Sequence, residues 1–177
     1  MYSAWFPVWL PIHFDHSLSM KKLFVTVIAG SALLSSWSVA DQKADVMALG
    51  QQKFLLCAAC HGMDGKGMQP APGMVMAASW VDSKILKKGS SEVIVAILMR
   101  GIKKVNPTEY MGQIMQPLGV AMPDEDVAAI VTYVRNTFGG HDDVVTPDQV
   151  KEWRAKYPTT EGPMERAKLD EMAGVTK

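Results

Sequence analysis

The stretch "LLCAACHGMDGKG", Leu55–Gly67, holds both cysteines of this 177-residue chain. Cys57 and Cys60 are separated by two residues, and His61 follows at once. On a helical turn this spacing places two thiols on one side of the helix, with an imidazole next to them. Such a pattern is typical of a metal site, of a redox-active pair of thiols or of a haem attachment site.

Zinc binding and thiol redox chemistry fit the rest of the sequence poorly. Zinc needs about four ligands, and beyond residue 40 the only cysteines and histidines are Cys57, Cys60, His61 and His141. A redox-active CxxC follows a strand in a βαβ unit, whereas a helical pattern leads into this motif. Covalent haem attachment uses the whole pattern, because each thiol forms a thioether with one vinyl group and His61 lies under the iron.

The N-terminal residues predict a cleaved secretory signal. From Met20 the chain has two lysines, an apolar run over residues 23–34 and a small-residue end at Ala40, in the order of a signal peptide. The apolar run is shorter than the roughly 20 residues that span a bilayer. We therefore expect translation to start at Met20, residues 1–40 to be an upstream segment plus signal peptide, and the mature chain to be periplasmic without a membrane span.

The charge balance does not support nucleic-acid binding. The chain has 18 basic and 18 acidic residues, and the loss of residues 1–40, with Lys21, Lys22 and Asp15, leaves a formal charge of −1. Basic side chains nevertheless gather between Lys84 and Lys104. This cluster fits either a solvated face or a docking surface for an acidic partner.

Apolar residues at helical spacing predict an all-α fold. The expected helices cover residues 45–60, 91–100, 123–138, 147–156 and 163–172. Pro123 is expected at the first helical position of its helix, Gly101 in a left-handed conformation after the second helix, and Thr146 and Gln149 in a capping box. Residues 62–72, with three glycines and two prolines, are expected to form a loop.

These residues resemble the class I c-type cytochromes. The resemblance rests on "CAACHG" at the end of an apolar helix, on "DGKG" behind it and on the closing helix "DEDVAAIVTYVRNTFG", and it covers about residues 46–140. It implies the all-α cytochrome c fold, with three core helices around one covalently bound haem c. The cytochrome c domain is then residues 41–140, and residues 141–177 are a helical C-terminal extension packed on the same domain.

The resemblance also implies roles for single residues. Cys57 and Cys60 become the haem thioethers, His61 the proximal iron ligand and Met115 the distal ligand. Some acceptor for the ring proton of His61 is needed to fix its tautomer. Many relatives supply it from a proline, but this chain has Ala78 at the corresponding place, so the acceptor stays open.

The distal ligand departs from the family's usual Met-Pro sequence. Gln116 follows Met115, and the Met-Pro dipeptide of this segment is Met122-Pro123, which lies too close to the next helix to reach over the haem. Met115 has the expected distance to a following glycine and to the helix. Met111, Met122, His141 and an open sixth site remain alternatives.

Ligation by histidine and methionine implies one-electron transfer, because it leaves no open coordination site on the iron. We expect an electron carrier without catalytic residues, or the electron-accepting subunit of a dehydrogenase complex. The closing sequences are similar to those of cytochrome c domains found alone or fused to quinoprotein, sugar or alcohol dehydrogenases. Expected partners are a dehydrogenase, a terminal oxidase or another cytochrome. The alternatives are a haem-based sensor, gas-binding or peroxidase-like protein with an open sixth site, and a subunit whose haem is structural.

Overall fold

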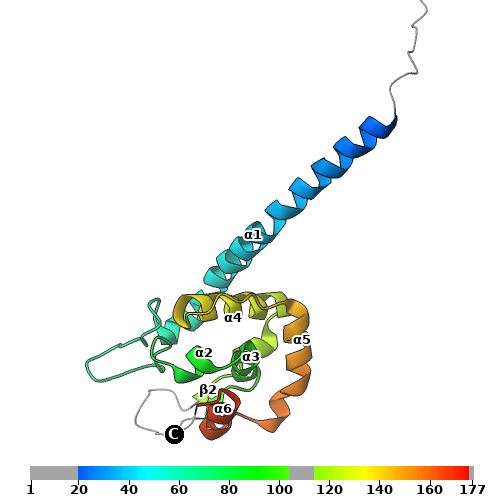
Figure 1. The fold of residues 1–177 in the computed structure, drawn as a ribbon. Coiled ribbons are helices and arrows are strands. Elements are labelled where there is room, and N and C mark those ends of the chain that lie inside the picture. The colour runs from blue at the N-terminus through cyan, green and yellow to red at the C-terminus, as the bar shows by residue number, and fades with distance from the viewer. Residues whose placement is uncertain (1–19, 104–113, 176–177) are drawn as a thin grey trace, which may run out of the picture. The chain divides into compact units, whose positions relative to one another are not determined.

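A computed structural model describes the backbone of residues 20–103 and 114–175, and the side chains of residues 41–103 and 115–175. The chain divides into two compact units, Met1–Ala40 and Asp41–Lys177, and all that follows concerns the second. Its secondary structure is almost entirely helical (Figure 1), so the predicted all-α class is confirmed. The elements in chain order are α1 Met20–His61, α2 Lys84–Lys88, α3 Ser91–Arg100, β1 Ile102–Lys103, β2 Ile114–Met115, η1 Leu118–Ala121, α4 Asp124–Phe138, α5 Pro147–Lys156, η2 Thr159–Glu161 and α6 Arg166–Met172.

The predicted bounds of α3 and α5 are confirmed, including the reciprocal Thr146–Gln149 capping box. The expected start at residue 45 is wrong for α1, because no proline lies between Met20 and that position and the helix is continuous there. Pro123 is the N-cap of α4 and not its first helical residue, since its ψ of 152° is extended. Gly101 has the expected positive φ of 74°, but its ψ of −176° is extended, unlike the left-handed helical residue that we predicted.

Helices α1 and α4 cross at Gly50. A Cβ atom on Gly50 would overlap the carbonyl oxygen of Ala129 and the side chain of Tyr133 on α4. Only glycine therefore allows the two backbones to approach this closely. Phe54, one turn further along α1, is fully buried, and its ring centroid lies 5.3 Å from that of Tyr133.

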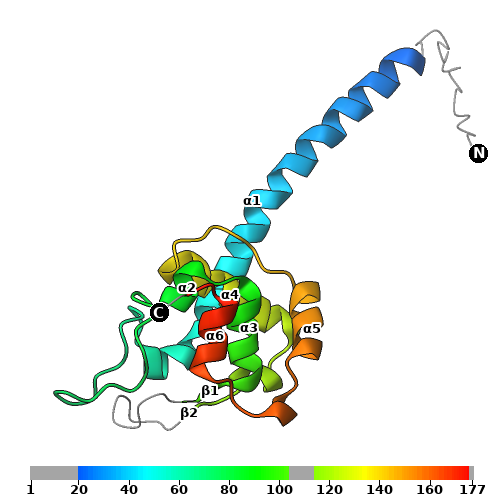
Figure 2. The same ribbon diagram turned by 60° about the horizontal axis from the view of Figure 1, so that its bottom comes forward.

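The C-terminal residues complete a second apolar cluster on the other side of α3. Leu169 of α6 is fully buried and packs in one cluster with Val93 and Ile97 of α3. Figure 2 shows α6 alongside α3. The expected helix start at residue 163 is wrong, because Met164 is extended and pairs with β1: its N–H donates to Gly101, and its carbonyl accepts from Lys103.

Helix α5 is joined to the rest of the domain by polar side chains, among them Lys156, whose Nζ lies 3.6 Å from the carboxylate of Glu92. The Arg154 guanidinium donates to the carbonyl oxygens of Gly119 at 3.1 Å and Met122 at 2.9 Å, and to the carboxylate of Asp124 at 2.8 Å. Tyr157 donates its hydroxyl to Glu92 of α3 at 2.8 Å. Helix α5 therefore fixes both η1 and the start of α4.

The junction before α3 is held by a partly buried ion pair. Arg135 of α4 donates to the carboxylate of Asp143 at 3.0 Å and to the carbonyl oxygen of Gly89 at 2.7 Å. Ser91 donates to the same carboxylate at 2.7 Å. Partial burial alone would raise the pKa of Asp143, but these hydrogen bonds and the Arg135 charge lower it below its usual value. The carboxylate therefore stays ionised and keeps α3 in register with α4.

Candidate functional site

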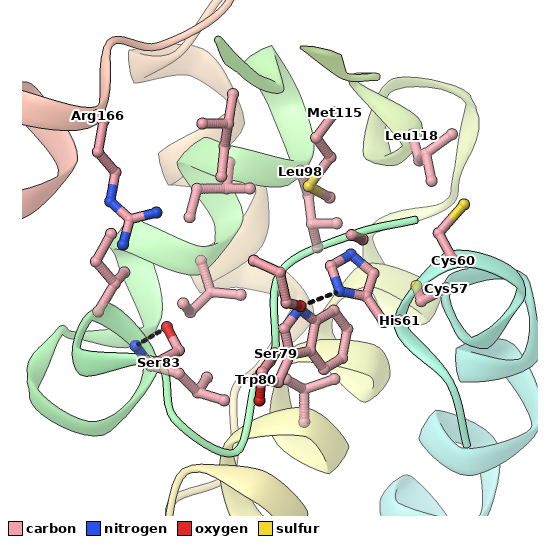
Figure 3. A pocket seen from close by; sticks show the side chains of 18 of the residues that line it. Cys57, Cys60, His61, Ser79, Trp80, Ser83, Leu98, Met115, Leu118 and Arg166 are labelled. Atoms are coloured by element: carbon pink, nitrogen blue, oxygen red, sulfur yellow. Dashed lines mark hydrogen bonds between the residues drawn. The ribbon is translucent and has the colours of Figure 1, made fainter. Parts of the chain in front are cut away.

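A cavity of about 840 Å³ opens beside the C-terminal end of α1. Its walls come from that helix end, the segment before α2, helices α2 and α3, the pair β1 and β2, η1, α4 and α6. Most lining side chains are apolar, such as Leu98, Ile130 and Val134. The four residues with predicted site roles line this one cavity (Figure 3): Cys57, Cys60, His61 and Met115.

His61 is the last residue of α1 and is held in one orientation. Its Nδ1 lies 3.1 Å from the carbonyl oxygen of Ala78, so the acceptor that the sequence left open is this backbone carbonyl. Burial lowers the pKa of His61 below its usual value, against the opposing effect of that hydrogen bond. The imidazole is therefore neutral at pH 7, with Nδ1–H as donor and the lone pair of Nε2 available to a metal ion.

Trp80 fixes the His61 ring from a second side. The two ring centroids are 4.3 Å apart, with an angle of 38° between the planes. The backbone N–H of Trp80 donates to Gly65 at 2.6 Å, so the loop after the CxxCH sets the position of the indole. Trp80 was not predicted from the sequence. Its place two residues after Ala78 was the available signal, because the segment whose carbonyl accepts from His61 also brings nearby side chains to that ring.

The two cysteines differ in exposure. Cys57 is 4% exposed, whereas Cys60, one turn later, is exposed. Burial, and to a smaller extent the nearby Cys60, raise the pKa of Cys57 to about 11. A thiol with so high a pKa stays protonated at pH 7, which disfavours a redox-active thiolate. In the part of the chain that the structure describes, no group of three or more His, Cys, Asp or Glu side chains could hold a metal ion.

Met115 reaches the cavity from β2 through a close backbone contact. Ile102 of β1 pairs with Met115 in an antiparallel register. A Cβ atom on Gly101 would overlap the Met115 carbonyl oxygen, and the positive φ of Gly101 also favours glycine. Figure 3 shows the Met115 sulfur pointing into the space that the His61 ring also faces.

The other candidate distal ligands have different places. Met122 packs against the main apolar cluster and does not belong to the cavity lining. His141 lies beyond α4, where its Nε2 is 3.0 Å from the carbonyl oxygen of Leu86, and it too lies outside the lining. Met111 falls outside the described residues. Of the candidates that are described, Met115 alone faces the cavity.

The basic cluster of residues 84–104 is divided by the structure. Arg100 donates to the carboxylate and carbonyl of Glu161 and to the carbonyl of Gly162. Lys103 pairs with Glu165 at 2.9 Å. These two bases are bound to the C-terminal extension, whereas Lys84, Lys87 and Lys88 at α2 are exposed.

The residues of this cavity fit a haem. Its volume lies in the range of about 300–1,000 Å³ typical of cofactor sites, and its apolar walls suit a large macrocycle. The buried protonated thiol of Cys57, the Cys60 thiol and the neutral His61 imidazole face it together. Residues 47–138, more than half of the chain, match the family model for cytochrome c.

The chain belongs to the cytochrome c family. Cytochromes c are haem-based electron-transfer proteins, and Cys57, Cys60 and His61 fit their CxxCH motif. The protein therefore binds one haem c covalently and acts as an electron carrier rather than as an enzyme. A search of curated proteins and a search of solved structures gave no match. Among the described residues, no helix has the length and apolar character to cross a membrane.

Proposed function

We propose that this cytochrome c carries single electrons in the periplasm, with His61 and Met115 as the axial ligands of its iron and with thioethers at Cys57 and Cys60. The observation that carries the proposal is that the His61 imidazole and the Met115 thioether face the same apolar cavity (Figure 3). The signal-like segment that ends at Ala40 supports export. Bound haem supplies a one-electron couple at its iron.

Other residues of the chain hold the two proposed iron ligands, His61 and Met115, in place. Ala78 and Trp80 hold the His61 ring, so Nε2 would offer its lone pair to the iron of a bound haem in one orientation. On the other side, Gly101 places Met115, whose thioether stabilises the reduced iron and raises the potential. Apolar side chains such as Leu98 exclude water from the cavity.

Electrons can leave where the cavity wall is open. Leu56 lines the cavity and is 55% exposed, and its neighbour Leu55 is 57% exposed. Cys60 is exposed in the same turn of α1. A redox partner that covers this apolar edge would come close to the haem without any rearrangement of the fold. We propose a dehydrogenase, a terminal oxidase or another cytochrome as this partner, in line with the resemblance of the closing helix.

The decisive experiment is Met115→Ala with Met122→Ala as the matched control. We expect the oxidised wild type and Met122→Ala to be low-spin with the weak far-red band of methionine–iron coordination. Met115→Ala should lose that band and bind carbon monoxide when reduced, because the sixth position opens. If the band survives in Met115→Ala and disappears in Met122→Ala or Met111→Ala, the distal ligand is Met122 or Met111 instead. A wild type that is high-spin and binds carbon monoxide readily would contradict the carrier and favour a sensor or peroxidase-like protein.

A further inference from the structure

The mostly apolar wall of the cavity also contains charged side chains. The charged side chains of the lining are Asp82, Lys84, Lys103, Arg166 and Asp170. Arg166 and Asp170 belong to α6, which lies outside the residues 47–138 that match the cytochrome c model. The family's own part of the chain therefore does not account for them, although α6 forms part of the haem cavity.

The chemistry of haem determines which of its groups lies near Arg166. The two vinyl groups and the two propionates lie on opposite edges of the macrocycle, so thioethers at Cys57 and Cys60 direct the propionates to the other end of the cavity. Figure 3 shows Arg166 across the cavity from both cysteines. We propose that Arg166 binds a haem propionate, so that the C-terminal extension contributes a cofactor-binding residue. This inference rests on the haem attachment within the proposed function and not on the identity of the distal ligand.

Arg166 is the best suited of the cavity's cations. Its Nε donates to Asp170 at 3.3 Å, and among the described residues neither of its Nη atoms has a hydrogen-bond partner. The outer edge of the guanidinium is therefore available for the paired hydrogen bonds that arginine makes with carboxylates. Lys103, by contrast, is engaged with Glu165 at 2.9 Å, and Lys84 is exposed at the start of α2.

The position of Arg166 is fixed by its surroundings. Three residues later on the same helix, Leu169 is fully buried against α3. Just before the helix, Met164 exchanges backbone hydrogen bonds with Gly101 and Lys103. Asp170 also lines the cavity, and its carboxylate would repel a propionate if Arg166 did not lie between them. The ion pair with Asp170 therefore orients the guanidinium. The charge that it offers to the haem is positive.

This arrangement has an electrochemical consequence. A cation beside the propionate favours the reduced iron, which carries one positive charge less, and so raises the midpoint potential. It also keeps the pKa of the propionate low, so that this group stays ionised in both oxidation states. Without the cation, the propionate pKa rises and differs between the oxidised and reduced proteins. Oxidation then releases a proton, and the potential falls with rising pH.

The test is Arg166→Gln in the full haem-loaded protein, with the midpoint potential measured from about pH 5 to about pH 8. We expect a lower potential at pH 7 and a steeper fall with pH than in the wild type. The control Lys168→Gln removes the same charge from the same helix. Like Arg166, Lys168 pairs with an acidic residue of its own helix, Glu171, and it is exposed. The other charged side chains of the lining, Asp82, Asp170, Lys84 and Lys103, are present in both variants, and among them only Asp170 loses its partner in Arg166→Gln.

A second variant predicts the opposite sign. Asp170→Asn removes a negative charge from the cavity wall and leaves the guanidinium to the propionate alone, so we expect a higher potential than in the wild type. The steeper fall of the potential with pH should appear only when Arg166→Gln is present as well. Equal shifts in Arg166→Gln and Lys168→Gln, with unchanged pH dependence, would overturn the proposal even if Arg166→Gln were less stable. The far-red band reports the distal ligand separately, so failure here is distinguishable from failure of the Met115 assignment.

Discussion

The proximal wall of the haem cavity consists of residues close together in sequence, whereas the distal wall depends on residues far apart. On the proximal side, Cys57, Cys60 and His61 lie in one turn at the end of α1, and Ala78 and Trp80 follow within twenty residues. On the distal side, Met115 is placed by Gly101, and the turn η1 that follows is bound by Arg154 of α5. Local sequence therefore determines the attachment site, while tertiary contacts place Met115, which we propose as the sixth ligand.

The two walls should respond differently when their supports are removed. The proximal wall is part of the helix crossing that forms the main apolar cluster, so its loss should unfold the domain. The distal wall is a short segment between β2 and α4, so its loss should release the ligand before the domain unfolds. The variants below separate these behaviours and are given from the largest expected effect to the smallest.

Gly50→Val should have the largest effect, because it forces α1 and α4 apart. A side chain at Gly50 would overlap the Ala129 carbonyl and the Tyr133 side chain. We expect the free energy of unfolding to fall by about 3 kcal/mol or more, measured by urea unfolding of the haem-loaded protein with far-UV circular dichroism. The far-red band should disappear in the same transition, since both walls depend on this crossing.

The matched control for this change is Gln51→Val, which places the same side chain at the next, exposed position of α1. It should cost only a few tenths of a kcal/mol, from helix propensity. If Gly50→Val does not fold at all, Gly50→Ala gives a milder version of the same overlap. If Gly50→Ala and Gln51→Val have the same free energy of unfolding, the two helices do not meet as described.

Arg154→Met should loosen the distal wall alone. Its guanidinium binds the carbonyl oxygens of Gly119 and Met122 and the Asp124 carboxylate. Because these bonds involve a charged donor, we expect a loss of about 2 kcal/mol. In a urea titration the far-red band should disappear well before the far-UV signal, in contrast to Gly50→Val. Lys151→Met, an exposed change on the same helix, should keep the two transitions together. Coincident transitions in Arg154→Met would contradict the independence of the distal wall.

The features that could be predicted from the sequence are those that lie within a single element. The CxxCH, the apolar stripe of α4 and the Thr146–Gln149 capping box each lie within one element, so spacing alone locates them. The sequence also predicted the family and its haem. Met115 was chosen by resemblance, and its place in the cavity agrees with that choice without testing its role as ligand.

The features that the sequence missed depend on contacts between distant segments. The true start of α6 follows from the backbone pairing of Met164 with β1, which no periodicity within residues 163–172 reveals. Trp80 matters because His61 lies against it, and Arg166 matters because α6 returns to the cavity wall. Helix α2 has only one turn, capped by Ser83, and is too short for a helical pattern to stand out.

Tyr157→Phe should have the smallest effect, and it tests whether α5 supports the distal wall only through Arg154. The Tyr157 hydroxyl donates to Glu92 of α3, and its loss should reduce the free energy of unfolding by about 1 kcal/mol at pH 7. The far-red band and the far-UV signal should still disappear together, because the Arg154 bonds to η1 remain. A band lost early in Tyr157→Phe would mean that the docking of α5 as a whole, and not Arg154 alone, holds Met115.

The same variant has a pH signature with a definite sign. Burial, the hydrogen bond to Glu92 and the charge of Glu92 raise the pKa of Tyr157 from 10.0 to about 12. Between these values the unfolded chain loses the phenolic proton while the folded protein keeps it, so the stability falls as the pH rises. Tyr157→Phe has no such proton and should lose less stability over this range than the wild type, in urea titrations at stepped alkaline pH. Glu92→Gln should also show a smaller loss, because it removes the charge that raises the pKa. Equal alkaline losses in all three proteins would place the Tyr157 hydroxyl in water and remove this link between α5 and α3.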